Sequence, residues 1–115
     1  MSELQQSAQF FKALSEPVRL RILNLLLHSD AEICVCALIE ALDIPQSVIS
    51  RHLAYLRKAE LVQARREGVW MHYSLHAQMP TMYRSVLAEF KRGSLSEPQL
   101  KADFDKIGCV LCVSA

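Results

Sequence analysis

The chain has 115 residues, of which 51% are hydrophobic and 22% charged, and its formal net charge is only +1. These values describe one globular domain and exclude a disordered or strongly basic chain, so any DNA-binding surface must come from local charge. No apolar run reaches the roughly 18 residues that a membrane span needs, and the N-terminus lacks a signal-peptide pattern. The four cysteines are therefore expected in a reducing cytoplasm, where closely spaced thiols usually serve metal or redox chemistry.

Two helices are expected before the first cysteine. Periodic apolar residues predict a helix over residues 3–13, and Ser15-Glu16-Pro17 is a typical start signal for the next one. The segment 18–28 is apolar on nearly every side, which predicts a central, buried helix. Its two arginines, Arg19 and Arg21, are expected to keep solvated head groups or to cap neighbouring helices.

The segment 32–61 predicts two short amphipathic helices separated by a break at Asp43-Ile44-Pro45. In the second helix, Ile49, Leu53 and Leu56 form one apolar stripe. The opposite face carries small, hydrogen-bonding and basic side chains, which suit base edges and phosphates in a major groove. The candidate DNA-binding residues of this helix are Gln46, Ser47, Ser50, Arg51, His52, Tyr55 and Lys58. Of these, His52 lies beside the apolar stripe and is expected either to pack or to contact one phosphate.

After residue 61 the apolar period changes from 3.6 to 2, which predicts a β-hairpin with a turn at Glu67-Gly68. A hairpin directly after a recognition helix is a wing. Arg65 and Arg66 lie near its tip and are candidates for contacts with the DNA backbone or the minor groove. The expected fold is mainly α with a small β-hairpin, a winged helix-turn-helix.

A further amphipathic helix is expected over residues 79–92. This helix and the first one have more apolar surface than so small a chain can bury alone, which predicts a homodimer through the two. Residues 1–92 are interpreted as the DNA-binding and dimerisation domain. Residues 93–115 form a tail with a short helix at 98–107, followed by Cys109 and Cys112.

Cys34 and Cys36 lie at the start of the first helix of the reading motif, and thiols of this kind bind soft metal ions. In an ideal helix, side chains at i and i+2 point about 200° apart and cannot share an ion. Joint ligation therefore requires that the first turn is unwound or unwinds on binding. The helix N-terminus should also favour the thiolate. The alternative is that the two are small buried residues and that the tail thiols are incidental.

Four segments, Leu14–Leu23, Glu32–Leu38, Val48–Leu53 and Arg65–Gly68, resemble the ArsR/SmtB family of metal-responsive winged-helix repressors, in the family's order. The resemblance covers residues 8–90. Glu32–Leu38 is similar to the arsenic-responsive branch, whose members are dimers that leave their operator on binding arsenite or antimonite. By this resemblance Cys34 and Cys36 match the first two ligands. The usual third position is Ile39, which makes Cys109 or Cys112 the replacement.

The resemblance thus implies a repressor that binds operator DNA as a dimer, with As(III) or Sb(III) as inducer and no constitutive cofactor. An enzyme is not expected, because no Ser/His/Asp grouping, carboxylate pair or glycine-rich phosphate loop occurs. Two alternatives remain at this point. The thiols, Cys109 and Cys112 above all, could form a redox or persulfide switch in a repressor of the same fold, or they could hold structural zinc in a protein-interaction module.

Overall fold

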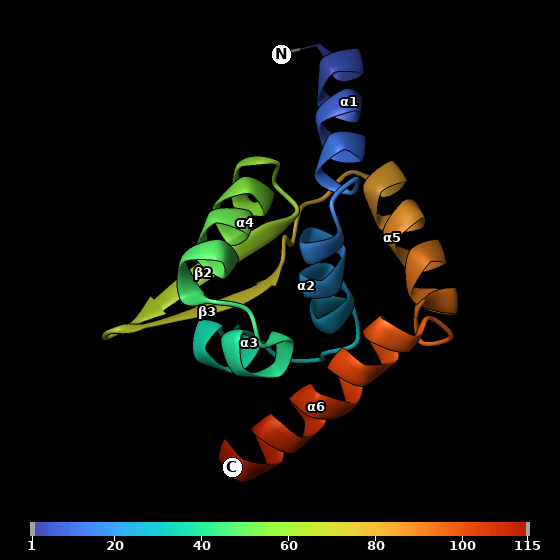
Figure 1. Ribbon diagram of the computed structural model, residues 1–115. Coiled ribbons are helices and arrows are strands. Elements are labelled where there is room, and N and C mark those ends of the chain that lie inside the picture. The colour runs from blue at the N-terminus through green and yellow to red at the C-terminus, as the bar shows by residue number, and fades with distance from the viewer. Residues whose placement is uncertain (1, 115) are drawn as a thin grey trace.

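The computed structural model describes residues 2–114, with side chains as far as Leu111. Within these residues the chain forms six helices and one three-stranded sheet (Figure 1). The elements are α1 (Glu3–Ala13), α2 (Pro17–Leu27), β1 (Ile33–Cys34), α3 (Val35–Leu42), α4 (Gln46–Lys58), β2 (Val62–Glu67), β3 (Trp70–Leu75), α5 (Thr81–Ser94) and α6 (Pro98–Ser114). None of the described helices is both long and apolar enough to cross a membrane.

Helix α2 is central, as predicted. Its N-terminus has Pro17 in the first turn, and the Glu16 carboxylate accepts a hydrogen bond from the Arg19 amide at 3.0 Å, which satisfies one of the free amides at the helix start. Ile22 and Leu23 are fully buried. The other helices and the sheet surround this apolar helix, so α2 touches every part of the reading motif.

The break between α3 and α4 lies where it was predicted. Asp43 ends α3 in the left-handed conformation, with φ 54° and ψ 47°, and Pro45 precedes the first residue of α4. The predicted apolar stripe of α4, consisting of Ile49, Leu53 and Leu56, is fully buried. The helix-turn-helix is therefore fixed by this stripe on one side and by the tight turn at Asp43 on the other.

The hairpin has one more strand beside it than expected. The sheet order is β1-β3-β2, with Cys34 opposite His72. A strand of two residues shows no alternation in sequence, so only pairing with β3 reveals it. The hairpin turn is also displaced by one residue from the prediction, because Glu67 pairs with Trp70 and leaves Gly68-Val69 as the turn. Gly68 has φ +60°, a conformation that a type II′ turn requires at this first position.

The C-terminal segment differs most from the sequence-based expectation. The predicted helix at residues 98–107 extends to Ser114, so Cys109 and Cys112 fall within α6. The helix packs against α2 and α3, with Leu100 and Ile107 buried. Gly108 and the β-branched residues after it are weak helix formers, and tertiary packing overrides that preference. The boundary predicted after residue 92 lies inside α5, which ends at Ser94.

Candidate nucleic-acid interface and thiol site

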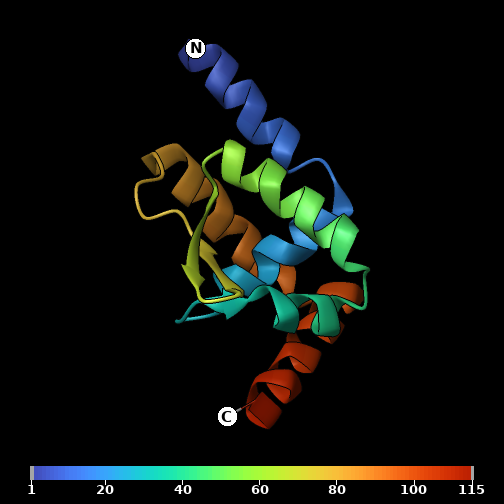
Figure 2. The ribbon, with the colours of Figure 1, turned by 90° about the vertical axis from the view of Figure 1, so that its left-hand side faces the viewer.

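Helix α4 and the hairpin lie on the same side of α2, and the hairpin projects outward beyond α4 (Figures 1 and 2). Most of the predicted polar face of α4 is exposed on this side. The exposed members of the predicted set are Gln46, Ser47, Ser50, Arg51 and Lys58. Arg57, which the sequence-based set omits, is exposed too, and its place beside Lys58 in the last turn of the helix was a readable signal. This face combines short polar groups with three cations, as a major-groove surface requires.

Two residues of the predicted set, His52 and Tyr55, are at least partly buried and contact Arg19 of α2. His52 is only 8% exposed, and its Nδ1 lies 3.4 Å from Arg19 Nη1 and 3.9 Å from Glu16 Oε2. Burial lowers the pKa of His52 below the usual histidine value. Tyr55 is half-buried beneath the Arg19 guanidinium, which lies 4.0 Å from the ring centroid. The structure thus places His52 in the contact between α2 and α4. Of the two roles expected for it, packing or a phosphate contact, this position corresponds to packing.

Arg19 joins three helices at this point. Its Nε donates to Ala13 O at 2.8 Å and its Nη2 donates to Lys12 O at 3.1 Å, so it caps the C-terminus of α1 while it covers Tyr55 of α4. Carbonyls of a last helical turn lack intrahelical donors, which is the reason why a guanidinium fits here. The expectation that the arginines of α2 cap neighbouring helices is confirmed for Arg19.

The two arginines of the wing differ in their surroundings. Arg65 Nε donates to Glu32 at 2.8 Å and its Nη2 donates to Glu67 at 3.1 Å, and these hydrogen bonds raise the pKa of its guanidinium. Arg66 instead donates from Nε to Gly68 O at 3.2 Å. Two carboxylates offset the charge of Arg65, so Arg66 is the better placed of the two to attract a phosphate.

Cys34 and Cys36 lie on either side of the junction between β1 and α3. Cys34 is the last residue of β1 and the N-cap of α3, with extended backbone (φ −66°, ψ 141°), whereas Cys36 is in the first turn. Partial burial raises the pKa of Cys36, and the neighbouring Cys34 thiol raises it further. Hydrogen bonds from the amides of Ala37 and Cys36 lower it only in part. The amides at the helix start thus favour the thiolate, as expected, but burial and the Cys34 thiol outweigh them and leave the pKa of Cys36 raised.

The extended backbone at Cys34 bears on whether the two thiols can bind one ion. The 200° divergence between i and i+2 side chains applies only when both residues are helical. Because α3 begins at Val35, Cys34 already lies outside the helix. No helical turn therefore has to unwind before both thiols can bind the same ion.

The part of α6 that carries Cys109 lies at the same end of α3 as this pair. Near the start of α6, Asp103 and Leu42 bind a common arginine, whereas Gly108 and Leu111 share a cavity of about 310 Å³ with Ile33. Helices α3 and α6 therefore run in opposite directions. Cys109 is exposed, and the side chain of Cys112 lies outside the described residues. Among the side chains that are described, no three His, Cys, Asp or Glu residues gather into a metal-binding group.

Comparison with known proteins identifies the class. Residues 16–64 match the family described as "Bacterial regulatory protein, arsR family". An arsenic resistance transcriptional regulator of Pseudomonas putida, ArsR1, is 40% identical over 87 residues, which cover 76% of this chain and 67% of that protein. The arsenical resistance operon repressor of Escherichia coli is 44% identical over 81 residues, covering 70% and 68%. The chain belongs to the ArsR family.

The fold agrees with this assignment. A homodimeric winged helix-turn-helix DNA-binding domain of Mycobacterium bovis, Mb0332, superimposes with a TM-score of 0.66 at 29% identity, covering 82% of this chain and 87% of that one. The ArsR-family chain described here is thus a winged helix-turn-helix transcriptional repressor, and its family consists of DNA-binding regulators rather than enzymes.

Proposed function

We propose that the protein is a homodimeric repressor that releases its operator when trivalent arsenic or antimony is bound by Cys34, Cys36 and a thiol of α6. The single observation that carries the proposal is the position of Cys34 and Cys36 on either side of the strand-to-helix junction that opens the reading motif of an ArsR-family chain. The names of two relatives, in P. putida and E. coli, refer to arsenic and arsenical resistance.

The DNA-facing part of the proposal rests on α4 and the wing. Ser47 and Ser50 near the helix start are short enough to approach base edges, and Arg51 and Lys58 have the charge to meet phosphates. The Arg66 guanidinium at the wing would bind the sugar-phosphate backbone beside the minor groove. Because one such face covers only one half-site, two copies related by a two-fold axis would read a pseudo-palindromic operator.

Helices α1 and α5 are the proposed dimer surface. Phe10 of α1 stacks on Tyr83 of α5 with ring centroids 4.0 Å apart, and the Tyr83 hydroxyl donates to Gln6 O at 3.1 Å, so the two helices form one unit. Leu4 and Phe11 on this unit are 80% and 50% exposed. Large apolar side chains exposed together favour burial against a second copy.

The donor set fits a soft, three-coordinate ligand. Cys34 and Cys36 supply two thiols at the start of α3, and α6 supplies the third through Cys109 or Cys112. Arsenic(III), when bound, would hold sulfur in place of hydroxide. Each hydroxide would leave as water with the proton of the thiol that replaces it. The chain's own contribution is to hold the Cys34–Cys36 pair in place through β1 and to carry the third thiol on a helix packed against α3.

The test uses labelled duplex DNA from the promoter of the protein's own gene and full reducing conditions. We expect arsenite to raise the operator dissociation constant by about 5- to 150-fold, the range of a coupling free energy of 1–3 kcal/mol. An unchanged dissociation constant at saturating arsenite would remove the inducer role and leave only the repressor.

The exposure of Cys109, three residues from Cys112 on the same helix, favours one other candidate, a thiol redox or persulfide switch of the same fold. The operator-binding assay also distinguishes metalloid ligation from this switch. Release of DNA by arsenite in the presence of reductant supports ligation, whereas release only by an oxidant or a persulfide donor supports the switch.

A further inference from the structure

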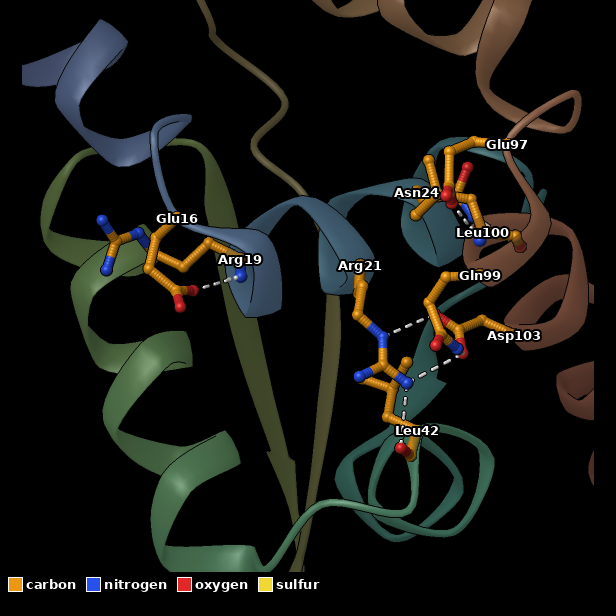
Figure 3. A network of polar contacts seen from close by, with 9 residues as sticks. All are labelled: Glu16, Arg19, Arg21, Asn24, Leu42, Glu97, Gln99, Leu100 and Asp103. Carbon is orange, nitrogen blue, oxygen red and sulfur yellow. Dashed lines mark hydrogen bonds and ion pairs between the residues drawn. The ribbon is translucent and has the colours of Figure 1, made fainter.

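One guanidinium connects the C-terminal helix to the end of α3. Arg21 of α2 donates from Nε to Asp103 Oδ2 at 2.8 Å and from Nη2 to Asp103 Oδ1 at 3.0 Å. The same Nη2 donates to the carbonyl of Leu42 at 3.1 Å (Figure 3). Leu42 is the last residue of α3 and Asp103 lies in α6, so the two thiol-bearing segments meet at this side chain.

The geometry of this link is well defined. Asp103 is only 2% exposed, and Gln99 Nε2 donates to its Oδ1 at 3.0 Å. The paired N–H groups of a guanidinium fit the two oxygens of a carboxylate, and such charge-assisted pairs hold both partners in a fixed orientation. The hydrogen bond to Asp103 raises the pKa of Arg21, so the link stays charged.

The Leu42 carbonyl is a sensitive place for such a link. A carbonyl in the last turn of a helix has no intrahelical donor, and here Arg21 supplies one. The next residue, Asp43, has φ 54°, which is strained for a residue other than glycine and persists only when its neighbours hold it. The turn that sets the direction of α4 begins at this residue.

The two halves of α6 are held differently. The first half is held by polar contacts with α2, because Asn24 Nδ2 donates to Leu100 O at 3.2 Å in addition to the Asp103 pair (Figure 3). The second half, with the thiols, packs through apolar residues such as Ile107. A force on the second half is therefore resisted at Asp103 and transmitted to Arg21.

We infer that Arg21 is a positioning residue that couples the docking of α6 to the turn between α3 and α4. The inference rests on the proposed function only for the nature of the ligand and the DNA. A displacement of α6 moves Asp103, the Arg21 guanidinium follows, and the Leu42 carbonyl loses its donor. The α3–α4 turn then loosens, and α4 is no longer held in the orientation that reads DNA.

Hydrogen exchange on the full chain tests the coupling without any ligand. Asp103→Asn removes one charge of the link, and Asp105→Asn is the matched control, because Asp105 lies on the same helix and pairs only with exposed Lys101 among the described residues. We expect exchange of the Asp43 and Ile49 amides, which bond to Ile39 O and Pro45 O, to become roughly tenfold faster in Asp103→Asn alone. Exchange equal to the parent, or a uniform rise that includes α1, overturns the inference.

Operator binding then measures the regulatory consequence. In Asp103→Asn the ratio of dissociation constants with and without arsenite should shrink by roughly two- to thirtyfold, while arsenite stoichiometry and the response of Asp105→Asn match the parent. If arsenite fails to release the parent protein but exchange at the turn still responds to Asp103→Asn, the inducer assignment falls and the coupling stands. If arsenite changes the operator dissociation constant of the parent and of Asp103→Asn by the same factor, the coupling is overturned.

Arg21→Lys provides a second route if Asp103→Asn does not fold. Lysine keeps the charge but lacks the planar fork that serves Asp103 and Leu42 together. We expect faster exchange at the α3–α4 turn and a smaller arsenite response from this variant too. Parental behaviour in both measurements overturns the inference.

Discussion

Cys34 and Cys36 lie on either side of a strand-to-helix junction, because Cys34 ends β1 and Cys36 lies in the first turn of α3. The change of backbone conformation between them removes the divergence that a continuous helix would impose on the two side chains. The pairing of Cys34 with His72 across the sheet fixes the extended residue, so this junction is built into the winged fold itself.

The thiol assignment predicts a graded set of serine variants. Cys34→Ser or Cys36→Ser should abolish stable arsenite binding and DNA release, because each removes one of the two proposed ligands at the start of α3. Of Cys109→Ser and Cys112→Ser, one should reduce arsenite affinity strongly and the other little. Arsenite stoichiometry by metal analysis and operator release by fluorescence anisotropy provide the two readouts. If all four variants respond like the parent, the ligand set is wrong.

The exposed face of α4 predicts which substitutions weaken DNA binding through charge. Arg51→Ala and Lys58→Ala should each lower operator affinity and reduce the slope of log K against log salt by about 1 for each phosphate that is no longer neutralised. Lys106→Ala is the control, since Lys106 is exposed on α6, away from α4 and from the proposed dimer helices. A salt slope that stays at the parental value in both α4 variants would place phosphate recognition elsewhere.

The surface of α1 and α5 predicts the oligomeric state. Phe11→Glu introduces a charge into the exposed apolar surface and should shift the protein toward monomer, with a loss of operator affinity since two half-sites are no longer read together. Val69→Glu on the wing, also highly exposed and apolar, should leave the mass measured by light scattering unchanged. A dimer that survives Phe11→Glu at low micromolar concentration would point to a different interface.

The two histidines beside α2 predict a loss of stability in acid. Burial lowers the pKa of both His52 and His28, so the unfolded chain binds protons more readily than the folded one. Their contribution to the free energy of unfolding is therefore complete above the ordinary value of 6.5 and is lost as the pH falls through it toward the lower folded pKa. The melting temperature should fall between about pH 7.5 and pH 5.

The double variant His28→Gln/His52→Gln should show a smaller fall in melting temperature over the same interval. His76→Gln, in the loop after β3, is the control and should follow the parent. The explanation is wrong if the double variant loses as much stability in acid as the parent does.

The sequence by itself determined those features that depend on local periodicity and short-range backbone preference. The buried stripe of Ile49, Leu53 and Leu56 repeats with the helical period, and the break at Asp43 precedes a proline, so both were readable from neighbouring residues. The exposed face of α4 followed from the stripe, and so did most of the candidate DNA-binding residues.

Only the tertiary structure decided the features that depend on residues far apart in the chain. Strand β1 exists because β3 pairs with it, and that pairing is what holds Cys34 in extended backbone outside α3. His52 turns inward because Arg19 and Glu16 lie opposite it. The continuation of α6 past Gly108 and the link from Asp103 to Arg21, 82 positions away, rest on packing against α2 and α3. Local patterns report what a residue prefers, whereas packing determines which partner it meets.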